Sequence, residues 1–329
     1  MENLVNHQGG IDFGLINEPV IRINHLDYTL RTPTGRLRSG LARRLLFKQF
    51  VFVGICTPDV MAGVAVVDLQ YVANGFFYVF DRNSRCLTEA KRTSPPWTVD
   101  ISPFPEEAAA FFKTGALSVR LSGDRLLVES REMRLAVKLG QVDATPLRIC
   151  TPSGFRGWTY TRKLTPVPVA GSLRIKGQSY SLDPDSSQAI MDWTAGYLRR
   201  NTWWNWAAIA TVLSDNRRLG LNLACGVNET GATENAFWID DHQVKVDSVK
   251  FVYDEQDDRG KWRITSGDGR VRLEFTPVAD RGEKLNALLV VSRFTQFLGF
   301  FSGILRDEAG NQIRLDNCPG WTEEHFARW

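Results

Sequence analysis

Short apolar runs, each separated from the next by turn residues, begin at Lys48 and continue along most of the chain. Residues 48–57, 61–72 and 75–82 are rich in Val, Phe and Tyr, and Thr-Pro-Asp and Ala-Asn-Gly turns separate them. β-Branched and aromatic residues are enriched in strands, and turns at this spacing are typical of antiparallel sheets. The pattern therefore predicts consecutive antiparallel strands rather than helices.

The same pattern of strand-like runs separated by turns continues in the rest of the chain. Residues 116–140 contain a Ser-Gly-Asp turn, residues 172–182 turn at Lys-Gly, and residues 262–275 alternate on both sides of Gly-Asp-Gly. Alternation around such turns predicts β-hairpins. Only residues 105–115 and 323–329 have a helical pattern, of about two turns each. We therefore predict an all-β, mainly antiparallel sandwich or barrel protein with few short helices.

A cluster of Pro and Gly between residues 151 and 171 interrupts the strand pattern. It includes Pro152, Gly154, Pro166 and Pro168. Proline is poorly tolerated in central strands, so the cluster predicts a junction between domains. The predicted organisation is an N-terminal arm over 1–45, a first β domain over 46–165 and a second β domain over 166–329.

The composition is that of a globular protein, with 43% hydrophobic and 23% charged residues among 329. Forty basic and 37 acidic residues leave a net charge of +3, which is too small to predict nucleic-acid binding. The start of the chain lacks a signal-peptide pattern, and the apolar runs fall short of the about 20 residues that a membrane-spanning helix needs. The five cysteines show no CxxC spacing. These features favour a cytoplasmic protein with reduced thiols.

Five arginines lie between Arg31 and Arg44. A run of this kind is most often a solvated arm that lies over a domain, and in some proteins it contacts phosphate groups or anionic lipids. With a net charge of +3, the sequence permits a weak peripheral membrane contact through Arg31–Arg44.

The sequence lacks the signatures of several common catalytic sites. It has no phosphate-binding loop and no G-x-S-x-G elbow, and its four histidines never occur at HExxH spacing. We therefore expect no metal site and no cofactor.

The most unusual block runs from Met191 to Ala207 and holds four of the ten tryptophans. In an extended chain Trp204 and Trp206 share one face, and Trp203 points the other way. Aromatic rings on the inner face of a β-barrel form an apolar wall with N–H donors, and arginines at its mouth hold anionic groups. The alternative is an ordinary core with arginines at its rim. The candidate ligand-binding residues of this block are Trp193, Arg199, Arg200, Trp203, Trp204 and Trp206.

A second block, residues 220–242, places polar side chains in strand-like surroundings, where burial requires hydrogen-bond partners. A carboxyl group such as that of Glu234, kept protonated by an apolar wall, is suited to general acid catalysis. The alternative is turn chemistry, because Asn, Asp and Gly favour loops. The candidate binding residues of the second half are Asn222, Asn228, Asn235 and His242, together with Gln296, which lies among phenylalanines.

With these blocks in view, the chain resembles the domain-of-unknown-function 2804 family. The matching stretches are residues 192–207, 220–240 and 294–303, and a weaker match covers residues 48–72. The resemblance extends over most of the chain after about residue 40, and residues 220–240 are its most specific part.

A local likeness links residues 171–206 to the carotenoid hydratase and tandem-lipocalin superfamily, whose hairpin is followed by an Asp-His-x-x-Gly and a Trp motif. This resemblance implies two lipocalin-like β-barrels, a lipophilic ligand and protonation of an alkene without a cofactor. It further implies that Asp192 is the acid and that Trp203, Trp204 and Trp206 form the wall. Trp193 stands where the hydratases often have His, which puts retention of hydration itself in doubt.

These observations predict two lipocalin-like domains that bind a lipophilic or amphipathic small molecule of lipid or isoprenoid type. Whether the molecule is carried or transformed stays open. In an enzyme, Asp192 or Glu234 would protonate a double bond and tryptophan faces would stabilise the carbocation, in hydratase, isomerase or lyase chemistry. A carbohydrate-binding or polysaccharide-active β-sandwich is the alternative, because exposed tryptophans stack on sugar rings. A third possibility is an interaction protein without a pocket.

Overall fold

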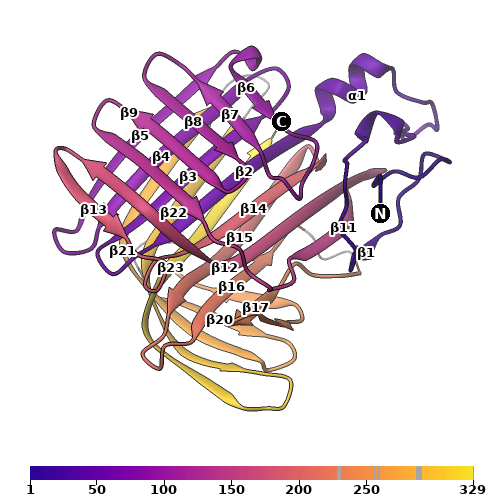
Figure 1. Ribbon diagram of the computed structural model, residues 1–329. Coiled ribbons are helices and arrows are strands. Elements are labelled where there is room, and N and C mark those ends of the chain that lie inside the picture. Colours follow the sequence, from indigo (N-terminus) through magenta and orange to yellow (C-terminus); the bar gives the residue numbers. More distant parts are fainter. Residues whose placement is uncertain (228–230, 255, 258–259, 287–290, 329) are drawn as a thin grey trace.

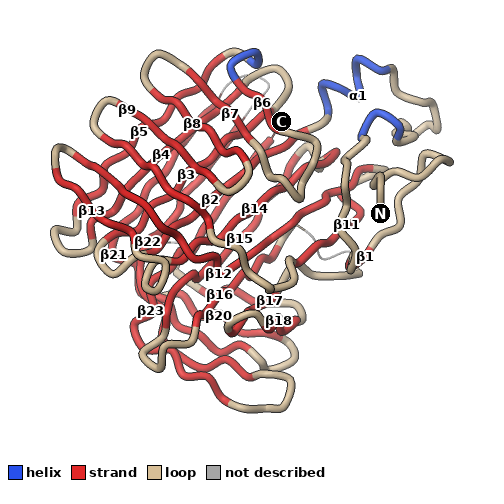
Figure 2. Tube along the Cα trace, viewed as in Figure 1, coloured by secondary structure: helices blue, strands red, loops and turns tan. Residues whose placement is uncertain are grey.

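The computed structural model describes residues 1–227, 231–254, 256–257, 260–286 and 291–328. Nearly all of the regular structure is antiparallel strand, gathered into two curled sheets (Figures 1 and 2). The helical segments in these ranges are α1 (Gly40–Leu46) and the short 3-10 turns η1 (His25–Asp27) and η2 (Pro96–Thr98). The predicted all-β class with few short helices is therefore confirmed.

The first sheet has 14 strands in the described part of the chain, ordered β5-β4-β3-β2-β14-β12-β10-β9-β8-β7-β6 with β1, β11 and β13 beside this path. Its strands are β1 (Gly14–Leu15), β2 (Lys48–Cys56), β3 (Val60–Asp68), β4 (Ala73–Asp81), β5 (Cys86–Ser94), β6 (Val99–Ile101), β7 (Ala110–Lys113), β8 (Leu117–Ser122), β9 (Arg125–Ser130), β10 (Met133–Leu139), β11 (Leu147–Ser153), β12 (Gly157–Ile175), β13 (Gln178–Leu182) and β14 (Gln188–Tyr197).

The second sheet has nine strands among the described residues, ordered β18-β17-β16-β15-β23-β22-β21-β20-β19. Its strands are β15 (Asn201–Val212), β16 (Arg218–Cys225), β17 (Ala236–Ile239), β18 (His242–Lys245), β19 (Val249–Val252), β20 (Trp262–Ser266), β21 (Val271–Asn286), β22 (Val291–Arg306) and β23 (Gln312–Arg328).

The chain changes sheet between Tyr197 and Asn201. The predicted domain limits of 46–165 and 166–329 therefore do not coincide with this change. The prolines do not end β12, because its register with β14 shifts between Leu164 and Val167, and such a bulge leaves Pro166 outside the ladder.

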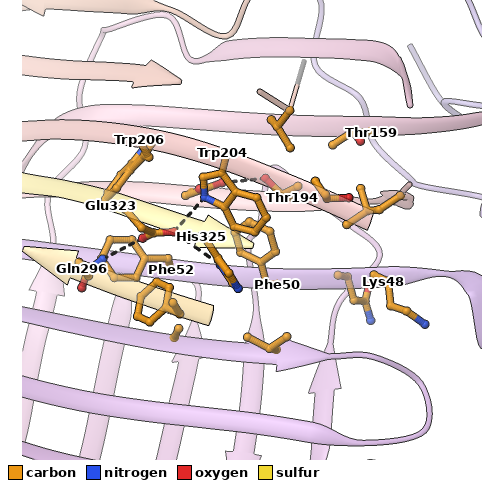
Figure 3. A pocket seen from close by; sticks show the side chains of 18 of the residues that line it. Lys48, Phe50, Phe52, Thr159, Thr194, Trp204, Trp206, Gln296, Glu323 and His325 are labelled. Atoms are coloured by element: carbon orange, nitrogen blue, oxygen red, sulfur yellow. Dashed lines mark hydrogen bonds and ion pairs between the residues drawn. The ribbon is translucent and has the colours of Figure 1, made fainter. Parts of the chain in front are cut away.

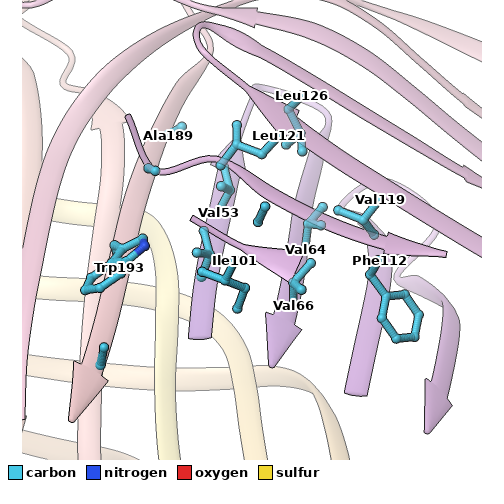
Figure 4. Close-up of a cluster of buried hydrophobic side chains, with 14 of the residues drawn as sticks. Val53, Val64, Val66, Ile101, Phe112, Val119, Leu121, Leu126, Ala189 and Trp193 are labelled. Atoms are coloured by element: carbon cyan, nitrogen blue, oxygen red, sulfur yellow. The ribbon is translucent and has the colours of Figure 1, made fainter. Parts of the chain in front are cut away.

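The described residues form four clusters of buried apolar side chains, and the three largest follow from the alternation of residues along the strands. On β2, Val51 and Val53 point into the core of the first sheet, whereas Phe52 points to the opposite face. Figure 4 shows part of this core, with Val53 labelled. A separate core fills the second sheet. The third cluster joins the two sheets, with Phe52 packed edge-on against Trp206 at 5.7 Å between ring centroids.

Because β2, β14 and β15 lie between neighbouring strands and carry buried side chains on both faces, apolar residues occupy most of their positions. The backbones of the two sheets also approach closely. A Cβ atom added at Gly220 on β16 would lie 2.6 Å from the carbonyl carbon of Thr165 on β12. Glycine is therefore required where the sheets meet.

The helix prediction was wrong for both segments. In residues 105–115, Ala110–Lys113 form β7, with Ala110 and Phe112 buried. Residues 323–328 belong to β23, and residue 329 lies outside the described residues. Cross-strand pairing and burial override local helix propensity in both places. The helix that does form, α1, begins after Ser39, whose hydroxyl accepts a hydrogen bond from the Ala42 amide at 3.2 Å.

Candidate functional site

A cavity of about 170 Å³ lies between the two sheets, beside the cluster that joins them (Figure 3). β2, β3 and β4 of the first sheet line one side, and β15, β22 and β23 of the second sheet line the other. The sequence analysis placed the tryptophans on the inner face of one barrel. The structure places the cavity on the faces that the sheets turn toward each other.

Aromatic rings form much of the wall. Phe50, Phe52 and Phe76 come from the first sheet, and Trp204, Trp206 and Phe294 come from the second. The indole N–H of Trp206 donates to the Asn222 side chain at 2.8 Å, which fixes the ring. Rings offer a large apolar surface with little conformational freedom, so the wall is suited to an apolar ligand.

Glu323 on β23 places a carboxyl group in this wall. Its Oε1 accepts a hydrogen bond from Trp204 Nε1 at 2.9 Å, and its Oε2 accepts one from Gln296 Nε2 at 3.2 Å (Figure 3). Burial raises the pKa of Glu323 to about 7, although these two hydrogen bonds and the charge of Arg281 oppose the shift. Glu323 is therefore a carboxyl group that holds a proton near neutral pH.

His325 lies two residues further along β23, on the same face of the strand. Its ring is tilted against Trp204 and lies edge-on to Phe294, with ring centroids 4.2 and 5.0 Å away. Burial lowers the pKa of His325 to about 3, so the imidazole is neutral. Ser292 hydrogen-bonds its Nε2 at 3.1 Å, while no described residue hydrogen-bonds its Nδ1.

A buried ion cluster forms the floor of the cavity. Lys163 on β12 donates a short hydrogen bond to Asp192 on β14, and its Nζ lies 3.8 Å from Glu234. Thr194 donates to the other Asp192 oxygen at 2.8 Å. Burial lowers the pKa of Lys163, but the attraction of Asp192 and Glu234 outweighs that effect and raises it. Both Asp192 oxygens therefore accept hydrogen bonds within this cluster, and Asp192 is the ion-pair partner of Lys163.

The raised pKa of Glu323 predicts how folding depends on pH. The ordinary pKa is 4.5 and the folded one about 7, so the folded state holds an extra proton between these values and loses stability as the pH rises through that range. Wild type should therefore lose about 3 kcal/mol of unfolding free energy between pH 4 and pH 8 from this group, and Glu323→Gln should not. The unfolding free energy of the variant, relative to that of wild type, should rise by the same amount over this range. Urea unfolding of both proteins measures this. Glu129→Gln, at an exposed glutamate outside the cavity, is the surface control. A pH-independent difference for Glu323→Gln contradicts the assignment.

With this geometry in place, comparison with known proteins identifies the family. A family model described as "Domain of unknown function (DUF2804)" matches residues 1–329. The chain belongs to the DUF2804 family. The resemblance inferred from the sequence is therefore confirmed, and the match also includes the N-terminal arm.

Two solved structures are similar to this DUF2804 protein. One is an AttH-like protein from Nitrosomonas europaea, with 12% identity, a TM-score of 0.48, and coverage of 86% of this chain and 92% of that chain. The other is kievitone hydratase from Nectria haematococca, with 12% identity, a TM-score of 0.49, and coverage of 86% and 88%. A comparison with curated protein sequences found no match.

Five of the side chains proposed from the sequence line the cavity of the DUF2804 protein. These are Asp192, Glu234, Trp204, Trp206 and Gln296. They come from four separate segments of the sequence, and the register of the two sheets brings them together.

The other tryptophans and the arginines of the 191–207 block lie elsewhere. Trp193 points into the core of the first sheet and packs against Tyr160, with ring centroids 6.0 Å apart. Trp203 is 52% exposed on the opposite face of β15 from Trp204. Arg199 donates to the Gly226 carbonyl, and Arg200 is exposed. Neither arginine lines the cavity.

Among the described residues, the polar side chains proposed from residues 220–242 lie behind the cavity wall or away from the cavity, apart from Glu234. Asn222 holds the Trp206 indole and donates to the Glu234 carbonyl at 2.7 Å, so it supports the wall from behind. Asn235 accepts from the Ala224 amide at 2.7 Å. His242 is exposed, with its Nε2 3.7 Å from Glu308. Asn228 lies outside the described residues.

Three residues that line the cavity were not predicted from the sequence: Glu323, His325 and Lys163. An available signal was the spacing Trp321, Glu323, His325, which puts three side chains on one face of a strand, but the segment was interpreted as a helix. Lys163 gave no signal, because its partner Asp192 is 29 residues away and meets it only through the pairing of β12 with β14.

No cluster of three or more His, Cys, Asp or Glu side chains suited to a metal ion occurs in the ranges that the structure describes. Across those ranges, no helix has the length and apolar character needed to cross a membrane.

Proposed function

We propose that the cavity between the sheets binds one amphipathic, unsaturated small molecule of lipid or isoprenoid type. The observation that carries this proposal is a cavity with aromatic rings from both sheets around it and the Glu323 carboxyl in its wall. The apolar body of the ligand would lie against Phe52, Phe76 and Trp204. Burial of an apolar surface of this size supplies the affinity.

The polar part of the ligand would lie at Gln296 and His325. Gln296 Oε1 and His325 Nδ1 are buried and have no hydrogen-bond partner among the described residues. A buried polar atom without a partner costs about 1–3 kcal/mol. A ligand hydroxyl would recover part of that cost, which favours an alcohol over a pure hydrocarbon.

We further propose that Glu323 exchanges a proton with an unsaturated carbon of the ligand. The electron pair of the double bond would form the new C–H bond, leaving a Glu323 carboxylate and a carbocation beside the face of Trp204. Return of a proton from an adjacent carbon to Glu323 would restore a double bond and the starting acid. This cycle consumes nothing and gives isomerisation or isotope exchange.

Binding is testable with geraniol, a ten-carbon unsaturated alcohol. We expect saturable binding of radiolabelled geraniol in equilibrium dialysis, and Val67→Trp, which fills the cavity from β3, should weaken it about tenfold or more. The matched control is Val252→Trp on β19, where the side chain is 46% exposed and outside the cavity. Unchanged affinity in a folded Val67→Trp protein, or no binding to wild type, contradicts the proposal.

The carbohydrate alternative needs tryptophan faces that are open to solvent. Trp204 and Trp206 instead line the cavity, and Trp206 is 6% exposed. Trp203 is exposed, and the ring paired opposite it on β23 is that of Phe326 rather than a second tryptophan. The geometry therefore supports a lipophilic guest better than a sugar.

A further inference from the structure

The segment from Tyr28 to Pro58 has a charge pattern that the cavity does not explain. It contains Arg31, Arg36, Arg38, Arg43, Arg44 and Lys48 and no Asp or Glu. Most of this charge surrounds α1, which lies at the edge of the molecule beside the first sheet (Figure 1). Arg31, Arg36 and Arg44 are exposed.

The same region exposes large apolar side chains. Leu41 is 69% exposed, and Leu37 and Leu45 are 47% and 42% exposed. Leu41 and Leu45 are four residues apart on α1, so they share one face of the helix. Leu46, at 39%, adds to the apolar area at the end of the helix.

Contacts on the inner side hold α1 in this orientation. Arg43 donates to the carbonyls of Leu26 and Tyr28, and Phe47 is buried directly after the helix. Lys48 donates to the Leu45 carbonyl at 2.5 Å. The exposed leucines are therefore a fixed feature of the folded chain rather than part of a loose tail.

We infer that α1 and its flanking residues dock peripherally on an anionic lipid surface. The docking surface consists of Arg31, Arg36, Leu37, Leu41, Arg44, Leu45 and Leu46. Leucines enter the boundary between headgroups and acyl chains, while arginines pair with anionic headgroups. Residues 28–58 contain no carboxylate, although the exposed Asp27 of η1, which contacts α1, lies just before this segment. An acidic protein would need a preformed apolar groove for the leucines beside its carboxylates, whereas an anionic lipid surface supplies both environments.

The docking surface around α1 lies next to one end of the cavity. Lys48 lines the cavity and bonds the last turn of α1, and Leu69, which accepts from Lys48 at 2.9 Å, lines the cavity too. Docking through α1 would bring this end of the cavity to the lipid surface. This consequence rests on the proposed ligand, whereas docking itself does not.

Vesicle flotation tests the inference with the full chain. We expect binding to vesicles of one part phosphatidylglycerol to three parts phosphatidylcholine, and about tenfold weaker binding to pure phosphatidylcholine vesicles. Leu41→Ser with Leu45→Ser should lower binding about tenfold, and Arg36→Gln with Arg44→Gln should remove the preference for phosphatidylglycerol. The matched control is Leu127→Ser with Arg125→Gln on β9, where both side chains are exposed; it should bind as wild type does.

The inference is overturned if the wild-type protein binds neither kind of vesicle, or binds the two kinds equally. It is also overturned if Leu41→Ser with Leu45→Ser binds as tightly as wild type does. Soluble poly-glutamate that competes fully and is bound equally by the leucine variant would show that the surface takes an acidic protein instead. Geraniol dialysis on the same variants separates the two proposals, because the docking variants should keep wild-type geraniol affinity.

Discussion

Replacing Lys163 by methionine is expected to lower the free energy of unfolding by about 3–5 kcal/mol. Lys163 is 3% exposed and is the ion-pair partner of both Asp192 and Glu234. Its removal takes the shared cation away from two buried carboxylates, and their burial then costs more free energy. Urea unfolding at pH 7 measures the loss.

Two controls separate this cause from a simple packing defect. Adding Asp192→Asn and Glu234→Gln to Lys163→Met should restore most of the lost stability, because no unpaired charge then stays buried. Lys176→Met, at an exposed lysine 4.0 Å from Glu132, should cost about 0.5 kcal/mol or less. A Lys163→Met protein as stable as wild type contradicts the structural role of the cluster.

Replacing Glu323 by glutamine is expected to lower deuterium exchange from heavy water into bound geraniol by about 100-fold or more. Glutamine still accepts the Trp204 hydrogen bond, but it has no acidic proton to transfer. Mass spectrometry of recovered geraniol measures the exchange, and dialysis confirms that the variant still binds.

The control for this exchange is Glu234→Gln, a carboxyl group of the same cavity that pairs with Lys163. Its exchange rate should stay within a few-fold of wild type. Exchange that survives in Glu323→Gln and is lost in Glu234→Gln would transfer the acid role to the residue that the sequence suggested.

The fold class was predictable because alternation within a strand is a local property. The Thr-Pro-Asp turn between β2 and β3 is visible in the sequence. The predicted Ala-Asn-Gly turn was wrong, because Ala73–Gly75 begin β4 and pair with β3, and residues 69–72 form the turn between these strands. The change of sheet after Tyr197 was not predictable in this way. A bulge at Pro166 lets β12 continue through a proline that would ordinarily end a strand.

The cavity was only partly predictable, because strands buried on both faces do not reveal which face lines a site. Asp192 and Trp193 are neighbours, yet one lines the cavity and the other fills the core of the first sheet. Glu323 and Trp204 meet because β15 pairs with β23, and a pairing across 119 residues leaves no local trace.

The central claim is that a guest occupies the space between the two sheets, and a crystal structure of the protein grown with geraniol tests it most directly. We expect electron density for geraniol between Phe52 and Trp204, with its hydroxyl near Gln296 or His325. Side chains of the two sheets packed together with no room between them, or geraniol bound only on the outer surface, would contradict the account.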